Sequence, residues 1–449
     1  MHGSAASQHA TPEWAVIPFV AYLLVIAVMP LLFSRLWESN LTKLCMALAA
    51  AVPIAFYLLA ISADGPSMLL RTAADYVAFM TLLGALYVIS GGICLRGSLV
   101  GTPRVNTSFL LVGSVLASLI GTTGASALLI RPLLRANERR ARATHIVVFF
   151  IFIVSNGAGL LTPLGDPPLF LGFLRGVPFS WTLRLAPTWA VVNGSLLALF
   201  ALIDVAASRL ERRQGTSARP PISSAAREPL HLDGAINVLW LLGIVGVVFA
   251  TGALGERLAR LPQLRTLIQV GGMALFAGLS WRTTGREVRQ ANRFSWAPVV
   301  EVAAIFLGVF VTMIPALSYL EEHGATLGIT QPWQFFWASG ALSSVLDNAP
   351  TYLTFASLAV GVTDAGSGTL AAGGLGALAA HPDGRQLLTA VSCGAVLMGA
   401  ITYIGNAPNF MVKAIAEQHR VHMPSFFGYI AWSLAILLPV FVIVSSMFF

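Results

Sequence analysis

Apolar residues fill long runs along this chain, separated by short polar or arginine-rich segments. A helix needs roughly 20 residues to cross a bilayer, and ten runs approach or exceed that length. They cover residues 15–33, 42–62, 76–95, 144–174, 181–204, 235–252, 266–281, 298–319, 386–416 and 426–447. The pattern predicts an all-α polytopic membrane protein with about ten transmembrane helices.

Two further apolar stretches have polar or kinked centres. Residues 107–130 contain "IGTTGASAL", and 333–361 contain "LDNAPTYL". Each stretch is long enough for two half-length helices that meet at a polar tip. We therefore predict two re-entrant hairpins, over 107–135 and 333–361.

Two of the spans are too long for one plain helix, and each is interrupted. The run 144–174 contains "LTPLGDPPLF" and the run 386–416 contains "ITYIGNAPNF". Proline removes a backbone donor and glycine frees the backbone, so both segments should break a helix. Broken helices within a membrane persist only where protein or a polar cavity satisfies the freed backbone groups.

Composition and charge support a membrane location. The chain has 449 residues, 56% hydrophobic and 10% charged, against about 25% charged in ordinary soluble domains. With the N-terminus outside, 20 of the 27 Lys and Arg residues fall in cytoplasmic loops, which agrees with the positive-inside rule. Dispersed loop arginines argue against nucleic-acid binding. We expect the protein in the cell inner (plasma) membrane, with a periplasmic N-terminus.

The two interrupted spans reveal an internal repeat. Aligned with each other, "LTPLGDPPLF" and "ITYIGNAPNF" share Thr, Gly, Pro and Phe, and Asp166 faces Asn406. Each half would hold five full spans, and an odd number inverts the second half relative to the first. The predicted organisation is a first inverted repeat over 1–207, a polar cytoplasmic linker over 208–234 and a second inverted repeat over 235–449. The Gly/Ala-rich segment 361–384 fits an external loop or a short extra helix.

Asp347 is the first candidate for chemistry, because it lies at a predicted hairpin tip in an otherwise uncharged stretch. Intramembrane carboxylates are costly and commonly functional. A cation and a proton would compete for such a group. Asp166 is the second candidate carrier. Either aspartate also fits a structural role as a helix cap.

Neutral polar residues surround these aspartates. Amide oxygens coordinate cations, and amides also tie unwound backbone together, so both roles stay open for Asn156, Asn348, Asn406 and Asn409. Hydroxyls of Thr122, Thr123 and Ser126 likewise fit either an ion site or close helix packing.

The motifs "SNGAGLLTPLGDPPLFLGF", "SSVLDNAPTYLTFA" and "YIGNAPNFMVKAIAE" resemble signatures of the ion transporter superfamily. That group includes citrate and dicarboxylate carriers, arsenite permeases and sodium–proton antiporters, and the resemblance is strongest to the antiporter branch. It implies a scaffold plus a moving transport domain, a homodimer, and cation binding by hairpin tips and broken helices. The matching residues are Asp347, Asn348, Thr351, Gly405, Asn406, Asn156, Gly157, Thr162, Gly165 and Asp166. The first tip, Gly121-Thr122-Thr123, departs from the pattern because it lacks an acid or Asn, and Thr122 and Thr123 stay candidate ion ligands through their hydroxyls.

The leading functional hypothesis is exchange of Na⁺ against H⁺ at a midplane site. Asp347 and Asn348 would bind Na⁺, and Asp347 and Asp166 would carry protons. The alternatives are a cation-coupled citrate or dicarboxylate symporter, with Arg131 as its main support, and an arsenite or other oxyanion permease. No metal-protease, hydrolase or nucleotide-binding motif occurs in the sequence, so we expect neither an enzyme nor a bound cofactor. A passive channel is the remaining class.

Overall fold

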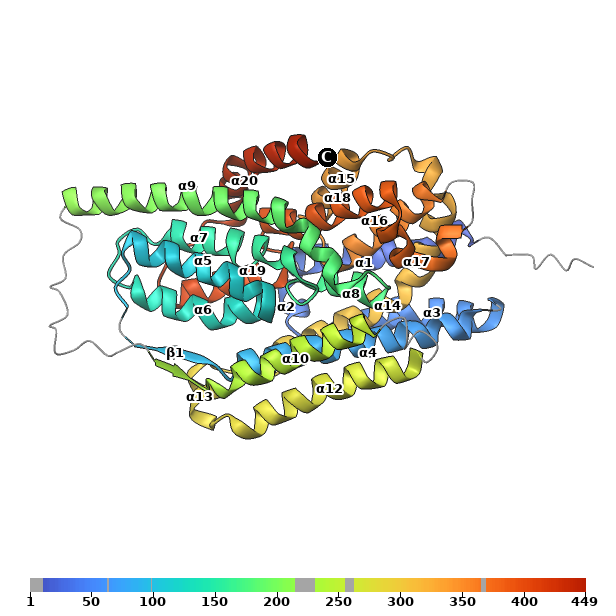
Figure 1. The fold of residues 1–449 in the computed structure, drawn as a ribbon, viewed down its shortest axis with the longest axis horizontal. Helices are drawn as coiled ribbons and strands as arrows, with labels where there is room; N and C mark the ends of the chain where they lie inside the picture. The colour runs from blue at the N-terminus through green and yellow to red at the C-terminus, as the bar shows by residue number, and fades with distance from the viewer. Residues whose placement is uncertain (1–10, 63, 98, 215–230, 255–261, 365–368) are drawn as a thin grey trace, which may run out of the picture.

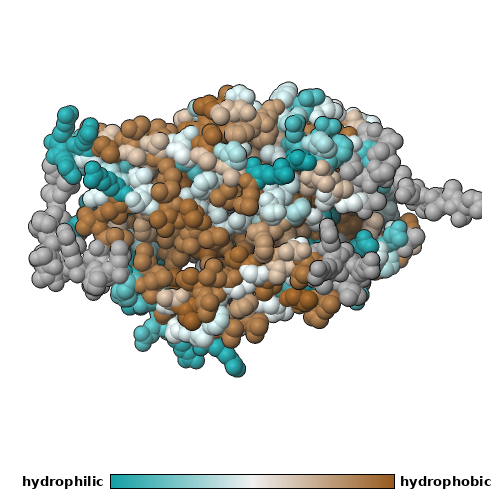
Figure 2. All heavy atoms as spheres, viewed as in Figure 1, coloured by the Kyte–Doolittle hydropathy of each residue, from teal (hydrophilic) through white to brown (hydrophobic). Residues whose placement is uncertain are grey.

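Ten helices of the protein are long and apolar enough to cross a membrane, the number that the hydrophobic pattern predicts. The computed structural model describes, and this count covers, residues 11–62, 64–97, 99–214, 231–254, 262–364 and 369–449. Apolar side chains cover a broad band on the face shown in Figure 2, and hydrophilic ones gather mainly toward the ends. The chain is therefore an all-α polytopic membrane protein.

The described residues of the first half form one strand and nine α-helices, joined by three short 3₁₀ turns (Figure 1). In order these are η1 (Glu13–Val16), α1 (Ile17–Leu32), α2 (Ser34–Trp37), α3 (Asn40–Ile61), α4 (Gly65–Ser90), β1 (Cys94–Arg96), α5 (Pro103–Ile120), α6 (Thr122–Ala136), α7 (Thr144–Ile153), η2 (Gly157–Leu161), α8 (Pro167–Leu174), η3 (Phe179–Leu185) and α9 (Ala186–Arg213).

The second half begins with a strand that pairs antiparallel with β1. Its elements are β2 (His231–Asp233), α10 (Ile236–Ala253), α12 (Pro262–Thr283), α13 (Arg286–Ala291), α14 (Ala297–His323), η5 (Gly324–Leu327), α15 (Pro332–Ser343), α16 (Asn348–Thr363), α17 (Thr369–Ala380), α18 (Pro382–Met398), η6 (Gly399–Ile401), α19 (Ala407–Gln418) and α20 (Phe426–Phe448). Most of the predicted linker 208–234 lies outside the described residues.

The ten candidate spans differ from the predicted set at one place. Pro103–Ile120, predicted as a hairpin arm, qualifies by length and composition, whereas the predicted span 266–281 does not. That run forms the 22-residue helix α12, in which Gln, Arg and Thr dilute the apolar residues. The Gly/Ala-rich segment contains a short helix, α17.

Local sequence explains how both predicted hairpin segments fold as two helices with a turn between them. Gly121 separates α5 from α6 in a conformation with φ of 80° that favours glycine. Between α15 and α16, the carboxylate of Asp347 accepts the backbone N–H of Ala349 at 3.0 Å and caps α16. Prolines at the first or second positions of α5, α8, α15 and α19 fit helix starts.

The helices pack in two groups. We call α1, α3, α4, α10, α12 and α14 the framework group, because they pack mainly on one another. The hairpin group comprises α5–α9, α15, α16 and α18–α20 with their 3₁₀ turns. In Figure 1, α5 and α6 lie toward one end of the molecule and α15 and α16 toward the other, while α3, α4, α10 and α12 run along the lower edge.

Polar contacts join separate segments of the chain toward each end. At one end, Arg96 pairs with Asp233 at 2.7 Å, and Arg293 donates to Gln418 at 3.3 Å. At the other, Arg175 pairs with Asp75 at 3.4 Å. The first end joins loops that the charge pattern assigns to the cytoplasm, and we call it the basic end.

Candidate functional site

The hairpin group contains two interrupted helices, which we call the breaks: one between α7 and α8, the other between α18 and α19. In each break, a threonine at the equivalent position binds the tip of a hairpin. The hydroxyl of Thr402 donates to the carbonyl of Ser344 at 2.5 Å, and that of Thr162 donates to the carbonyl of Ser118. Each hydroxyl also accepts the backbone N–H two residues later, at 3.2 Å. The equivalence pairs Ser118 with Ser344, so by count Gly121 corresponds to Asp347 and Thr122 to Asn348.

Asp166 is the acid of the first break, at the N-terminus of α8. Its side chain is only 1% exposed. One carboxylate oxygen accepts the hydroxyl of Thr122 at 3.0 Å, and the other accepts the amide of Asn348 at 2.5 Å. The carboxylate is therefore held by one donor from each hairpin tip, where the two repeats meet.

Asp347 is the acid of the second tip, and it lies close enough to Asp166 to interact with it electrostatically. Its Oδ1 accepts the N–H of Ala349, and no hydrogen bond to its Oδ2 occurs among the described residues. The neighbouring Asn348 is buried, and its Oδ1 has no hydrogen-bond partner in the described structure. An open carboxylate oxygen and an unpaired amide oxygen thus lie on consecutive residues, and both are oxygen ligands of the kind that hard cations prefer.

The other asparagines join the two breaks. Asn406 donates to the carbonyl of Ser155 and to Oδ1 of Asn156, both at 3.2 Å. Asn156 donates to Oδ1 of Asn409 at 2.7 Å, and Asn409 donates to two carbonyls of its own break. These amides therefore satisfy the unwound backbone, as the structural interpretation expects.

A cavity of about 850 Å³ lies between the framework and hairpin groups. Asp166, Asp347 and Asn406 line it from the hairpin group, while apolar residues of α1, α4 and α14 line it from the framework group. Trp37, Glu38, Lys43, Glu301 and Lys413 also line it. Trp37 ends α2 and Glu38 follows it, Lys43 and Glu301 lie near the starts of α3 and α14, and Lys413 lies midway along α19. The first four positions lie toward the basic end, so the cavity extends from the acids toward that end.

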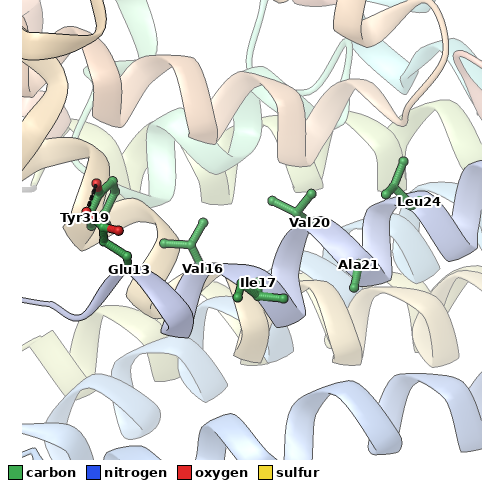
Figure 3. A pocket seen from close by; sticks show the side chains of 7 residues that line it. All are labelled: Glu13, Val16, Ile17, Val20, Ala21, Leu24 and Tyr319. Atoms are coloured by element: carbon green, nitrogen blue, oxygen red, sulfur yellow. Dashed lines mark hydrogen bonds between the residues drawn. The ribbon is translucent and has the colours of Figure 1, made fainter.

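Another hollow, of about 490 Å³, follows α1 on the surface (Figure 3). Figure 3 shows apolar side chains along one side of α1, with Glu13 next to Tyr319 at one end. The Tyr319 hydroxyl donates to Glu13 at 3.5 Å. None of the predicted site residues lines this groove, so the central cavity is the candidate site.

Residues 8–449 match the model of a family described as "Putative citrate transport". The chain belongs to this family. No protein of curated function matches it. Membership in a citrate-transport family, together with ten candidate spans, makes the chain a secondary transporter of the membrane.

Within this citrate-transport family member, six of the twelve predicted site residues line the cavity. These six are Thr122, Thr123, Gly165, Asp166, Asp347 and Asn406. The other six, which lie behind the wall, are Asn156, Gly157, Thr162, Asn348, Thr351 and Gly405. Asn348 reaches the site through Asp166, whereas Thr351 donates to the carbonyl of Asp347 at 3.0 Å and the Gly157 carbonyl accepts from Asn193 at 3.1 Å.

The sequence analysis missed the charged residues near the basic end of the cavity. Lys43 pairs with Glu301 at 2.7 Å, and Lys413 pairs with Glu417 at 3.4 Å. Lys43 and Lys413 are the only lysines in the sequence, and both line the same cavity. Their rarity among 27 basic residues was the available signal.

Proposed function

We propose that this secondary transporter exchanges Na⁺ for H⁺ at Asp347 and Asp166. The observation that carries the proposal is the pair of carboxyl groups in the cavity, of which Asp166 is only 1% exposed. Among the described residues, no Lys or Arg forms a hydrogen bond with either group. Uncompensated buried charge is expensive. A proton or a monovalent cation would each neutralise the site, so the two would compete.

The two acids would play different parts. Asp347 offers an unpaired carboxylate oxygen to the cavity beside Asn348, so it would be the first ligand of an arriving Na⁺. Asp166 already accepts two hydrogen bonds from the tips. A change in its charge would therefore act on hydrogen bonds to both hairpin tips. Asp166 would also serve as the second proton carrier.

A second candidate is a cation-coupled citrate or dicarboxylate symporter. The family description favours it, and so do Lys43 and Lys413, which line the cavity and offer cationic contacts to a carboxylate substrate. Against it, each lysine already pairs with a glutamate. For either candidate, we propose that the protein lies in the inner membrane and forms a homodimer.

Reconstitution in liposomes with an internal pH dye tests the proposal. Adding external Na⁺ to acid-loaded vesicles should raise the internal pH, and Asp347→Asn should abolish the change. Glu417→Gln, at the end of α19 and about half exposed, is the matched control and should retain it. Uptake of labelled citrate without any Na⁺-driven pH change would contradict antiport and support the symporter.

A further inference from the structure

Four basic side chains from three segments gather at the basic end. Arg131 and Arg135 lie four residues apart on α6, Arg293 lies between α13 and α14, and His419 follows α19. Helix α6 packs against α19, and Arg293 donates to Gln418, the residue before His419, at 3.3 Å. The three arginines also act electrostatically on His419. We call these four residues the basic cluster.

The arginines of this cluster have no carboxylate partner among the described residues. Arg135 donates to the backbone carbonyl of Leu95 at 3.0 Å, and Arg293 to the neutral side chain of Gln418 at 3.3 Å. Arg131 is half-buried and forms no hydrogen bond or ion pair in the described structure. Glu138 acts electrostatically on His419, in the opposite sense to the three arginines. Like charges brought together in a partly desolvated place repel one another, and no carboxylate among the described residues forms an ion pair with these three arginines.

The cluster spans both helix groups. Arg131 and Arg135 lie on a helix of the hairpin group, whereas Arg293 precedes α14 of the framework group. Asn292, the residue before Arg293, donates to the carbonyls of Gly91 and Ile93 at 2.9 and 2.7 Å, which fixes this turn on the framework group. Arg131 also interacts with Tyr87, which lines the central cavity. A ligand at the cluster would therefore touch both groups beside the cavity.

We propose that Arg131, Arg135, Arg293 and His419 form a binding site for a phosphate group. Guanidinium groups bind phosphate through paired, charge-assisted hydrogen bonds. A multivalent oxyanion would satisfy Arg131 and offset the mutual repulsion of the cluster. The same chemistry is offered by an anionic phospholipid headgroup and by a soluble phosphate. By bridging α6 to the turn before α14, either ligand would hold the two groups together at this end.

The test uses the full-length protein in nanodiscs and follows its unfolding temperature. One arm titrates inorganic phosphate against chloride at equal ionic strength in phosphatidylcholine discs; the other compares phosphatidylglycerol with phosphatidylcholine discs. Stabilisation by phosphate alone would identify a soluble ligand, and stabilisation by phosphatidylglycerol alone a lipid.

Arg131→Gln and Arg293→Gln should each lower the affinity for the stabilising ligand by about tenfold or more, as expected for the loss of one charge-assisted contact. Arg212→Gln, an exposed arginine at the same end on α9, is the matched control and should behave as the wild type. The proposed site would be refuted if all three variants were stabilised equally. It would also be refuted if neither ligand stabilised the wild type. Because Arg293 is exposed, its variant should fold even if the Arg131 variant does not.

Discussion

At the scale of single residues, the two repeats contribute one acid each at non-equivalent positions. Asp347 corresponds to Gly121 in the first repeat, and Asp166 corresponds to Asn406 in the second. A fully symmetric pair of repeats would place acids at both positions of each pair or at neither, giving an even set of four or none. Here the site holds two acids. A glycine at position 121 is also required by its backbone, since φ there is 80°. In the proposed function, this asymmetry would give one cation site at a nearly symmetric crossing of helices.

A buried ionic cluster at the base of the first hairpin gives a stability prediction. Asp204 is fully buried and contacts Arg140 at 2.7 Å, with His145 and Asn106 both at 2.9 Å. Asp204→Ala leaves the guanidinium of Arg140 without this partner and should destabilise the protein by about 3–5 kcal/mol. Thermal or denaturant unfolding measures the loss. Glu417→Gln, which breaks a surface pair, should change stability by less than about 1 kcal/mol, and equal effects of the two variants would refute the argument.

Thr402 gives a second residue-scale prediction. Thr402→Val removes the hydroxyl that binds the Ser344 carbonyl and accepts the N–H groups of Ile404 and Gly405. Unsatisfied buried groups cost about 1–3 kcal/mol each, so the variant should unfold at a lower temperature and bind Na⁺ more weakly. Thr402→Ser keeps the hydroxyl and should restore both properties. Failure of the serine variant to do so would show that the methyl group, not the hydrogen bond, matters.

The sequence exposes the two site acids because charge within apolar runs is visible without a structure. Lys43 and Lys413 could not be assigned in this way. Lys43 lies near the start of α3 and Lys413 midway along the 12-residue α19. In the sequence each lies at the edge of an apolar run, where a basic residue also fits a loop or headgroup position. Only the packing of α3 and α19 decides that both side chains line one cavity.

At the scale of elements, glycine and proline predict the breaks well because they change the backbone itself. Gly165 illustrates the constraint: a Cβ there would lie 2.3 Å from the carbonyl oxygen of Gly159. Boundaries are less predictable. The predicted end of the first half at residue 207 falls inside α9, which continues to Arg213 because polar and basic residues also fit a helix that extends beyond the bilayer.

The close packing of α14 against α16 gives a prediction at this scale, because we expect this contact to close the cavity at the end opposite the basic end. A Cβ on Gly361 would lie 2.5 Å from the Leu320 carbonyl oxygen, so Gly361→Val should force these helices apart at the end opposite the basic end. A cysteine at the cavity-lining position 309, introduced as Val309→Cys in a cysteine-free background, should then react with an impermeant thiol reagent added from that side.

The matched control for this experiment is Gly278→Val, at a position with no atom within 4 Å of an added Cβ. It should leave Val309→Cys protected. Labelling that is equally strong in both glycine variants, or absent from both, would contradict closure by this helix contact.

At the scale of the whole molecule, the framework and hairpin groups enclose a cavity that runs from the two acids toward the basic end. Individual hydrophobic segments predict helices but not which helices share a group, since every span is apolar on the faces that meet lipid or protein. The partition therefore needed the three-dimensional packing. The lining residues predict that the cavity is reached from the basic end.

Accessibility gives the matching prediction. Phe410→Cys, on the cavity face of α19, should be labelled by an impermeant reagent from the basic end and protected from the opposite side. Leu239→Cys, on the exposed surface of α10, is the control and is expected to show no such dependence on the side from which the reagent is added. Reaction of Phe410→Cys from the opposite side alone would contradict the cavity direction.

Proton release on Na⁺ binding tests the central claim most directly. Purified protein in weakly buffered solution near neutral pH should acidify the medium when Na⁺ is added, because the cation displaces protons from Asp347 and Asp166. Choline at equal concentration should have no effect, and Asp347→Asn should reduce the release to the choline level. Unchanged proton release in both Asp347→Asn and Asp166→Asn, or no release from the wild type, would contradict the account.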